Sequence, residues 1–132
     1  MTNATADAGT DDKPEHAPID LATMRASTAL LIGPDDAPEA LPPTGDELDT
    51  LTLRIRGQME LILPEVEVLA EKAPRKSVVQ YCAFACIGEA RRKLTATAAA
   101  NRGGAVAYAR RLARSLNALC DHYENLQPGV SA

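Results

Sequence analysis

A run of apolar residues between positions 48 and 69 constrains the fold of this chain more than any other feature. Its members follow one another at steps of three or four residues, and they are Leu48, Leu51, Ile55, Met59, Ile62, Val66 and Leu69. This is the periodicity of one face of an amphipathic helix with a coiled-coil-like seam. Because such a face must be covered by other elements, the run predicts a bundle of helices.

Local signals set the bounds of this helix. Thr44 and Glu47 precede the run with the spacing of a capping box. Pro64 lies inside the run, where a proline removes one helical hydrogen bond and clashes with the preceding turn. We therefore expect one helix over about residues 45–71, kinked near residues 60–64 rather than divided in two.

Two further helices are predicted, over about residues 76–97 and 104–126. Ser77 is the candidate N-cap of the first, whose apolar positions are Val78, Val79, Cys82, Ala83, Cys86, Ile87, Ala90 and Leu94. The apolar face of the second is formed by Val106, Ala109, Leu112, Leu116, Leu119, Cys120, Tyr123 and Leu126. Short loops between long helices favour antiparallel neighbours. The expected fold class is all-α, a small antiparallel bundle of three principal helices.

The N-terminal part of the chain has a different character. Residues 1–18 are small, polar and acidic, and we expect a disordered acidic tail because they cannot offset their ordering entropy by burial. Asp20 and Gly33-Pro34 mark the start and stop of a short helix over about residues 21–32, followed by a proline-rich linker up to residue 43. The bundle domain is expected over residues 44–127, with a disordered C-terminus at 128–132.

Charge is divided along the chain. The formal net charge is −4, but residues 1–47 hold ten acidic residues against Lys13 and Arg25. Residues 72–114 hold ten basic residues and one acid, Glu89. In an antiparallel hairpin, two basic runs would meet at one end of the bundle, and their residues are Arg91, Arg92, Lys93, Arg102, Arg110, Arg111 and Arg114.

This basic cluster is the candidate partner-binding site. We expect it to recognise an acidic protein segment, and the acidic N-terminal arm of the same chain is a possible competitor for it. Pairing with acids of neighbouring helices, such as Glu89 or Glu60, is the structural alternative. Nucleic-acid binding is the other functional use of the cluster, but the sequence has no helix-turn-helix or zinc-finger pattern and only 3% aromatic residues for stacking on bases.

No catalytic residues, metal ligands or cofactor are predicted. Asp121, His122 and Tyr123 are adjacent on a helix, where neighbours project about 100° apart and cannot easily act on one substrate atom. The thiols of Cys82, Cys86 and Cys120 are expected to be buried among apolar residues. A metal or redox site at these cysteines, and a ligand pocket inside the bundle, remain alternatives.

Self-association is expected from the small size of the core. Residues 44–127 hold few large side chains, and the long helix carries Leu53, Leu61, Leu63 and Val68 off its main seam. A homodimer would cover them. The chain begins without the pattern of a signal peptide and has no apolar run long enough to span a membrane, so a cytoplasmic location is expected.

Three segments carry a resemblance to a known family: "LPPTGDELDTLTLRIRGQMELILPEVE", "CAFACIGEARRKL" and "AVAYARRLARSLNALCDHYENL". Over about residues 41–126 the chain resembles an actinobacterial family of unknown function whose members are described as natural product biosynthesis proteins. The resemblance implies an accessory role in specialised metabolism or its control. It transfers no functional residue, because the segments are helix-length blocks rather than catalytic signatures. The function expected is that of a non-enzymatic interaction or regulatory protein.

Overall fold

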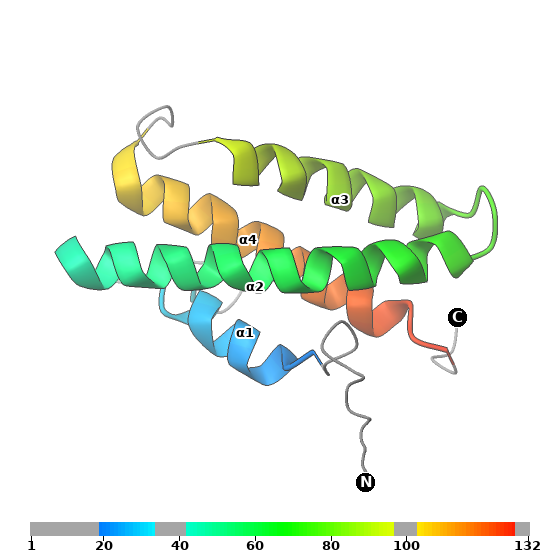
Figure 1. The fold of residues 1–132 in the computed structure, drawn as a ribbon, viewed down its shortest axis with the longest axis horizontal. Coiled ribbons are helices and arrows are strands. Elements are labelled where there is room, and N and C mark those ends of the chain that lie inside the picture. Colours follow the sequence, from blue (N-terminus) through cyan, green and yellow to red (C-terminus); the bar gives the residue numbers. More distant parts are fainter. Residues whose placement is uncertain (1–18, 34–41, 97–102, 129–132) are drawn as a thin grey trace, which may run out of the picture.

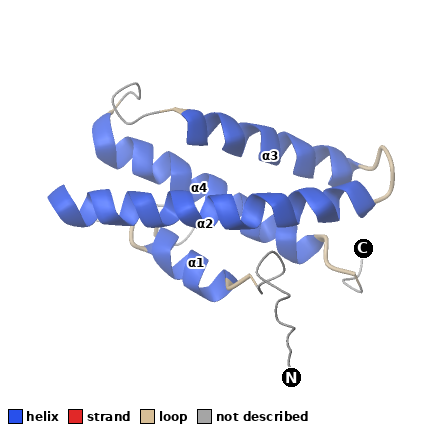
Figure 2. Ribbon diagram, viewed as in Figure 1, coloured by secondary structure: helices blue, strands red, loops and turns tan. Residues whose placement is uncertain are grey.

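The computed structural model describes residues 19–33, 42–96 and 103–128, and these residues form four helices and no strand (Figures 1 and 2). The all-α fold class is thereby confirmed. The helices are α1 (Leu21–Ala29), α2 (Gly45–Lys72), α3 (Val78–Thr95) and α4 (Gly104–Asn125). The predicted N-terminal tail, part of the linker and most of the predicted disordered C-terminus lie outside the described residues.

The helices α2 and α4 form a central pair. They make the most extensive contact in the described structure and run in the same direction (Figure 1). The helix α3 packs on one side of this pair and α1 on the other, and both run in the opposite direction (Figure 1). Each pair of helices that are consecutive in the chain is therefore antiparallel.

The core lies between α2 and α4. The predicted seam of α2 is confirmed, since Ile55, Met59, Ile62 and Val66 have no solvent exposure, although Leu69 is only half-buried. Small side chains complete the interior: Ala83 and Ala90 of α3 and Ala109 and Ala113 of α4 are fully buried. Alanines let helix backbones approach closely, and the chain has no Trp and one Phe to fill a wider gap.

The helix α1 belongs to the same core. Met24, Leu31 and Ile32 are buried with the residues of α2 and α4. A polar contact lies beside them, in which the Oγ1 hydroxyl of Thr28 donates a hydrogen bond of 2.7 Å to Oδ1 of Asn117. The periodic helix ends at Ala29, before the expected position 32, and residues 30–32 continue as a turn.

Ion pairs join the middle of α1 to the end of α4. The guanidinium of Arg25 donates hydrogen bonds to Asp121 Oδ1 at 2.9 Å and to Glu124 Oε1 at 2.8 Å. Both carboxylates lie near the C-terminus of α4, where the helix dipole disfavours negative charge. The cation of α1 therefore accounts for acids at positions that are unfavourable for α4 alone.

Two predicted helix caps are confirmed and one is wrong in detail. Asp20 accepts a hydrogen bond from the backbone N–H of Thr23, and Ser77 accepts one from Gln80. Thr44 is the N-cap residue of α2, but its side chain makes no capping hydrogen bond. The helix α2 continues through Pro64, which is exposed, so the carbonyl that loses its helical donor there can be hydrated.

Burial differs from prediction at several positions. Leu63 is 5% exposed rather than on the surface, because it lies on the flank of α2 that α3 covers. Conversely, Val78, Val79 and Cys82 are exposed, although they were expected on the buried face of α3. Residues 78–87 are apolar almost all round the helix, and two neighbouring helices can cover only one side of it.

Arg56 joins three helices at the end of the bundle where α2 begins. Its guanidinium donates a hydrogen bond of 2.7 Å to the Leu94 carbonyl at the end of α3 and another to the Tyr108 hydroxyl of α4. Tyr108 in turn donates to the Ala96 carbonyl at 3.1 Å. Because carbonyls at a helix C-terminus lack helical donors, Arg56 and Tyr108 satisfy groups that α3 leaves unpaired.

We predict that Arg56→Ala lowers the free energy of unfolding by about 1–3 kcal/mol, because two half-buried acceptors lose a charged donor. Chemical denaturation measures this loss. Arg75→Ala is the charge-matched control: Arg75 is exposed in the loop between α2 and α3, and we expect a change within about 0.5 kcal/mol. Equal effects of the two substitutions would contradict a specific role of Arg56.

Candidate functional site

The basic residues expected to bind a partner are directed toward different helices. Arg91 forms an ion pair of 2.7 Å with Glu67 of α2. Arg110 donates a hydrogen bond of 3.1 Å from Nε to the Leu31 carbonyl, which follows α1. The hydrogen bond between Arg91 and Glu67 lowers the pKa of Glu67 and raises that of Arg91, so each side chain stays charged and partly neutralises the other.

The remaining described members of the basic cluster belong to α3 and α4, where some lie between the two helices and others lie on the surface. Lys93 donates a hydrogen bond of 3.0 Å to the Ser115 hydroxyl of α4. Arg92 and Arg114 are exposed and Arg111 is half-buried, and both arginines of α4 have interactions within the chain. Arg102 lies outside the described residues. The structure therefore brings Lys93 and Arg114 together, and directs Arg91 and Arg110 elsewhere.

Lys93 and Arg114 line the same hollow between α3 and α4. Its volume is about 360 Å³, and its walls are formed by Ala85, Cys86, Glu89, Lys93, Arg114, Ser115 and Ala118. Every wall residue belongs to one of the two helices. Sequence reasoning named both cations but did not identify Ser115, because a lone serine within a helical pattern gives no signal of where its hydroxyl lies.

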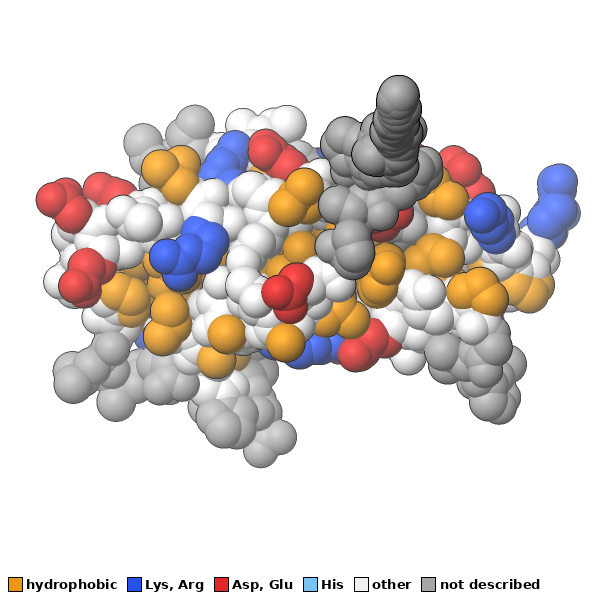
Figure 3. Space-filling view, turned by 60° about the horizontal axis from the view of Figure 1, so that its bottom comes forward, with side chains coloured by type: hydrophobic (Ala, Val, Ile, Leu, Met, Phe, Trp, Pro, Cys, Tyr) orange, Lys and Arg blue, Asp and Glu red, His pale blue; other side chains and the backbone are white. Residues whose placement is uncertain are grey.

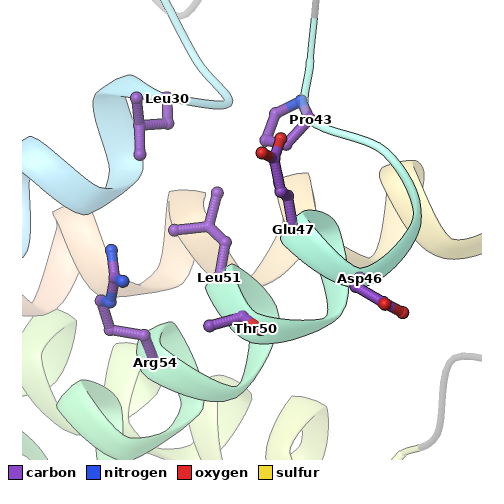
Figure 4. A pocket seen from close by; sticks show the side chains of 7 residues that line it. All are labelled: Leu30, Pro43, Asp46, Glu47, Thr50, Leu51 and Arg54. Atoms are coloured by element: carbon purple, nitrogen blue, oxygen red, sulfur yellow. The ribbon is translucent and has the colours of Figure 1, made fainter.

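Two other pockets border segments outside the described residues. One, of about 430 Å³, lies between the end of α1 and the start of α2 (Figure 4). Leu30 and Leu51 face each other across it, with Arg54 beside them, while Asp46 points away (Figure 4). The other, of about 380 Å³, lies near Tyr108 and Arg56. Unlike the hollow between α3 and α4, neither of these two pockets is lined by helix residues alone.

Large apolar side chains are exposed mainly on α2 and α3. On α2 the exposed fractions are 69% for Leu53, 63% for Leu61 and 46% for Val68. At about 100° per residue these three fall within about 80° of one another, on the side of α2 opposite its buried seam. In the space-filling view, hydrophobic side chains reach the surface along much of the molecule (Figure 3).

The start of α3 extends this apolar stripe. A hydrogen bond of 3.0 Å from Gln80 Nε2 to the Ala70 carbonyl brings the start of α3 beside the end of α2. Tyr81 is 76% exposed and Phe84 is 39% exposed. In this antiparallel register Phe84 is about level with Val68. We refer to Leu53, Leu61, Val68, Tyr81 and Phe84 as the α2/α3 apolar face.

The three cysteines are dispersed rather than clustered. Cys82 is exposed, Cys86 is half-buried and Cys120 is buried, with its Sγ 4.0 Å from the Met24 sulfur. Burial raises the pKa of Cys86 and of Cys120 to about 11. Within residues 19–33, 42–96 and 103–128, no three His, Cys, Asp or Glu side chains are grouped so as to hold a metal ion.

We predict that alkylation by iodoacetamide at pH 8 modifies Cys82 first. Cys86 and Cys120 should react more than about tenfold more slowly, because little of either thiol is ionised at this pH and both are shielded. Their rates should rise with pH toward about 11. Peptide mapping by mass spectrometry gives the order, and fast modification of Cys120 in the folded protein would contradict its burial.

No helix of the described residues is long and apolar enough to cross a membrane. Comparison with curated proteins finds no match to this chain. No solved structure matches it either. A family model does match, over residues 22–128, and the chain therefore belongs to the family of unknown function DUF6415.

Proposed function

We propose that this protein is a non-enzymatic helical interaction protein, and that the α2/α3 apolar face is its main binding surface. The exposure of Leu53, Leu61 and Tyr81, each more than 60%, is the observation that carries the proposal. A contiguous exposed apolar surface is characteristic of sites where proteins associate. A solvated face would instead present charged residues at these positions.

A second copy of the chain is the occupant that we propose for this face. The stripe on α2 has nearly equal spacings on either side of Leu61, since Leu53 precedes it by eight residues and Val68 follows it by seven. Two α2 helices that cross in antiparallel orientation would therefore place Leu61 against its copy and Leu53 against Val68. Such a contact is isologous, as a closed twofold dimer requires.

Charge at one edge of the stripe supports the same arrangement. Arg54 and Glu65 lie on the same flank of α2, seven residues before and four residues after Leu61, an offset of about 4.5 Å along the helix that two long side chains can span. In a twofold antiparallel contact, groups on the same flank of the two helices meet. Arg54 of each copy would then face Glu65 of the other, which gives two complementary pairs per dimer.

We predict that the protein is a dimer at micromolar concentration. Leu61→Glu should raise the dissociation constant of the dimer at least about tenfold, because burying the carboxylate of the new side chain costs more than about 1.4 kcal/mol of association free energy. Light scattering coupled to gel filtration measures the mass. Leu30→Glu is the control, since Leu30 is 51% exposed but lies in the turn after α1, outside the apolar face. The proposal would be contradicted if the folded wild-type protein were still monomeric at about 100 μM, well above the micromolar range at which the dimer is expected.

A charge exchange tests the antiparallel register. Arg54→Glu and Glu65→Arg should each weaken the dimer, and the double variant should recover at least part of the loss, because the complementary pair is restored with opposite polarity. Sedimentation equilibrium gives the dissociation constants. If the double variant is no tighter than the weaker single variant, the antiparallel register is wrong even if a dimer exists.

An acidic protein segment is a second candidate partner, and the position of the basic residues favours it. Arg111 and Arg114 belong to α4, whereas the α2/α3 apolar face belongs to α2 and α3, so different helices carry the two surfaces. The accessory role in specialised metabolism implied by the resemblance is part of the same proposal. A dimer with a basic side could hold an acidic biosynthetic or regulatory protein without chemistry of its own.

A further inference from the structure

The turn between α2 and α3 concentrates positive charge. Lys72, the last residue of α2, and Arg75 and Lys76 of the turn are exposed. In the part of the chain that the structure describes, none of these three side chains forms an ion pair or a hydrogen bond. Glu71 is the one acidic residue of the sequence between positions 68 and 88. Three cations and one acid leave this segment with a net charge of +2.

The outer side of α3 is apolar where it follows this turn. Val78 is 77% exposed, Tyr81 is 76% exposed and Cys82 is exposed. At spacings of three and four residues, these side chains share one side of the helix. Charge returns to that side at Glu89 and Arg92, which are 11 and 14 residues after Val78. We refer to the cations and this apolar stripe together as the α2–α3 corner, which consists of Lys72, Arg75, Lys76, Val78, Tyr81 and Cys82.

Gln80 holds the corner in one conformation. Its Nε2 donates a hydrogen bond of 3.0 Å to the Ala70 carbonyl near the end of α2. Its Oε1 accepts a hydrogen bond of 3.0 Å from the backbone N–H of Lys76. A further hydrogen bond of 3.1 Å runs from the Ser77 N–H to the Pro74 carbonyl. The cations of the turn are therefore fixed in position beside the apolar start of α3.

The corner lies at one end of the molecule. The turn reaches further than the ends of α1 and α4 in Figure 1, and basic side chains project at the same end in Figure 3. Lys72, Arg75 and Val78 line none of the three pockets described above. A projecting surface of this kind suits contact with a broad, flat partner better than it suits enclosure of a peptide or a small molecule.

We propose that the α2–α3 corner binds the surface of a bilayer that contains anionic phospholipids. Lys72, Arg75 and Lys76 contact the lipid phosphates, while Val78 and Tyr81 enter the layer between headgroups and acyl chains. Tyrosine suits this layer because its ring is apolar and its hydroxyl is polar. A second copy of the chain is a poorer occupant, because a twofold contact would set these cations against their own copies.

Sedimentation with phospholipid vesicles tests the proposal. Vesicles of phosphatidylcholine alone are compared with vesicles that also contain about 30% phosphatidylserine, an anionic lipid. We expect at least about tenfold tighter binding to the anionic vesicles, and weaker binding as salt rises from about 50 to about 200 mM. Equal binding to both kinds of vesicle, or to neither, would overturn the proposal.

Polyglutamate serves as the probe for an acidic protein partner, because it supplies negative charge without a lipid phase. At equal concentration of negative charge, it should bind less tightly than the anionic vesicles do. Polyglutamate binding as tight as vesicle binding would assign the corner to an acidic protein segment and would overturn the lipid proposal.

Lys76→Gly removes a cation without disturbing the turn. The backbone of Lys76 has a φ of 62°, in the left-handed region that glycine adopts without strain. This substitution should weaken binding to the anionic vesicles about fivefold, with the thermal unfolding transition little changed. Arg92→Gln is the control, because Arg92 is exposed about 21 Å along α3 from Val78, and it should change binding less than about twofold. Equal effects of the two substitutions would contradict a specific corner.

Val78→Ser tests whether apolar side chains enter the bilayer. It should weaken binding to the anionic vesicles several-fold, because it removes exposed apolar surface from the corner. Tyr81 is left intact here because it also belongs to the α2/α3 apolar face. Leu30→Ser is the control, since Leu30 is 51% exposed in the turn after α1. If both substitutions have the same effect, the corner does not insert and this part of the proposal is wrong.

Cys82 provides a second measurement within the corner. Its modification by iodoacetamide should slow several-fold with an excess of anionic vesicles, and should not slow with vesicles of phosphatidylcholine alone. An unchanged rate in vesicle-bound protein would place the corner away from the lipid and overturn the proposal. Leu61 is about 16 Å from Lys72 along α2, so Leu61→Glu should retain the preference for anionic vesicles even where the dimer is lost. Failure of the dimer and failure of lipid binding are therefore distinguishable.

Discussion

The contact between α2 and α4 is the interaction on which the rest of the structure depends. The two helices bury a continuous aliphatic seam, in which Ile55, Met59 and Ile62 meet Leu112, Leu116 and Leu119, all without solvent exposure. The other two helices pack on the flanks of this pair and make no extensive contact with each other in the described structure. Their positions follow from the pair, since each covers an edge of the seam that α2 and α4 leave open.

This arrangement determines which surfaces remain available. Flanking helices protect the two edges of the central pair, but nothing in the described residues covers the outer side of α2. Its exposed side chains, Leu53, Leu61 and Val68, are as apolar as the seam on the opposite side. The proposed association with a second copy therefore concerns the outer surface of α2 and α3 rather than a buried reaction centre.

The periodicity of the sequence was sufficient to predict the helices, because apolar spacing and capping residues are local signals. Ser77 and Asp20 are examples in which cap and helix start coincide as predicted. Membership of a family of unknown function agrees with the resemblance seen in the sequence, whereas a link to natural products is not tested by it.

Side-chain placement was harder to predict, because it depends on which neighbours a helix acquires. Leu63 is buried by α3, and Val78 is exposed since no helix of the described residues covers the outer side of α3. The destinations of the basic residues could not be read from their spacing: Arg91 pairs with Glu67, which is 24 residues away in the chain, and Lys93 contacts Ser115. Hydrogen bonds between residues far apart in the chain produce no periodic pattern in the sequence.

The attachment of α1 has a consequence for synthesis on the ribosome. Chains emerge at about 5–20 residues per second, and helices whose partners are close in sequence can pair as soon as they appear. The helices α2 and α3 are such neighbours, but Arg25 of α1 pairs with Asp121, which is 96 residues later. The helix α1 must therefore wait until α4 has emerged before its ion pairs and its contact with Asn117 can form. During that interval its apolar residues, Met24 and Leu31, have only α2 to shield them.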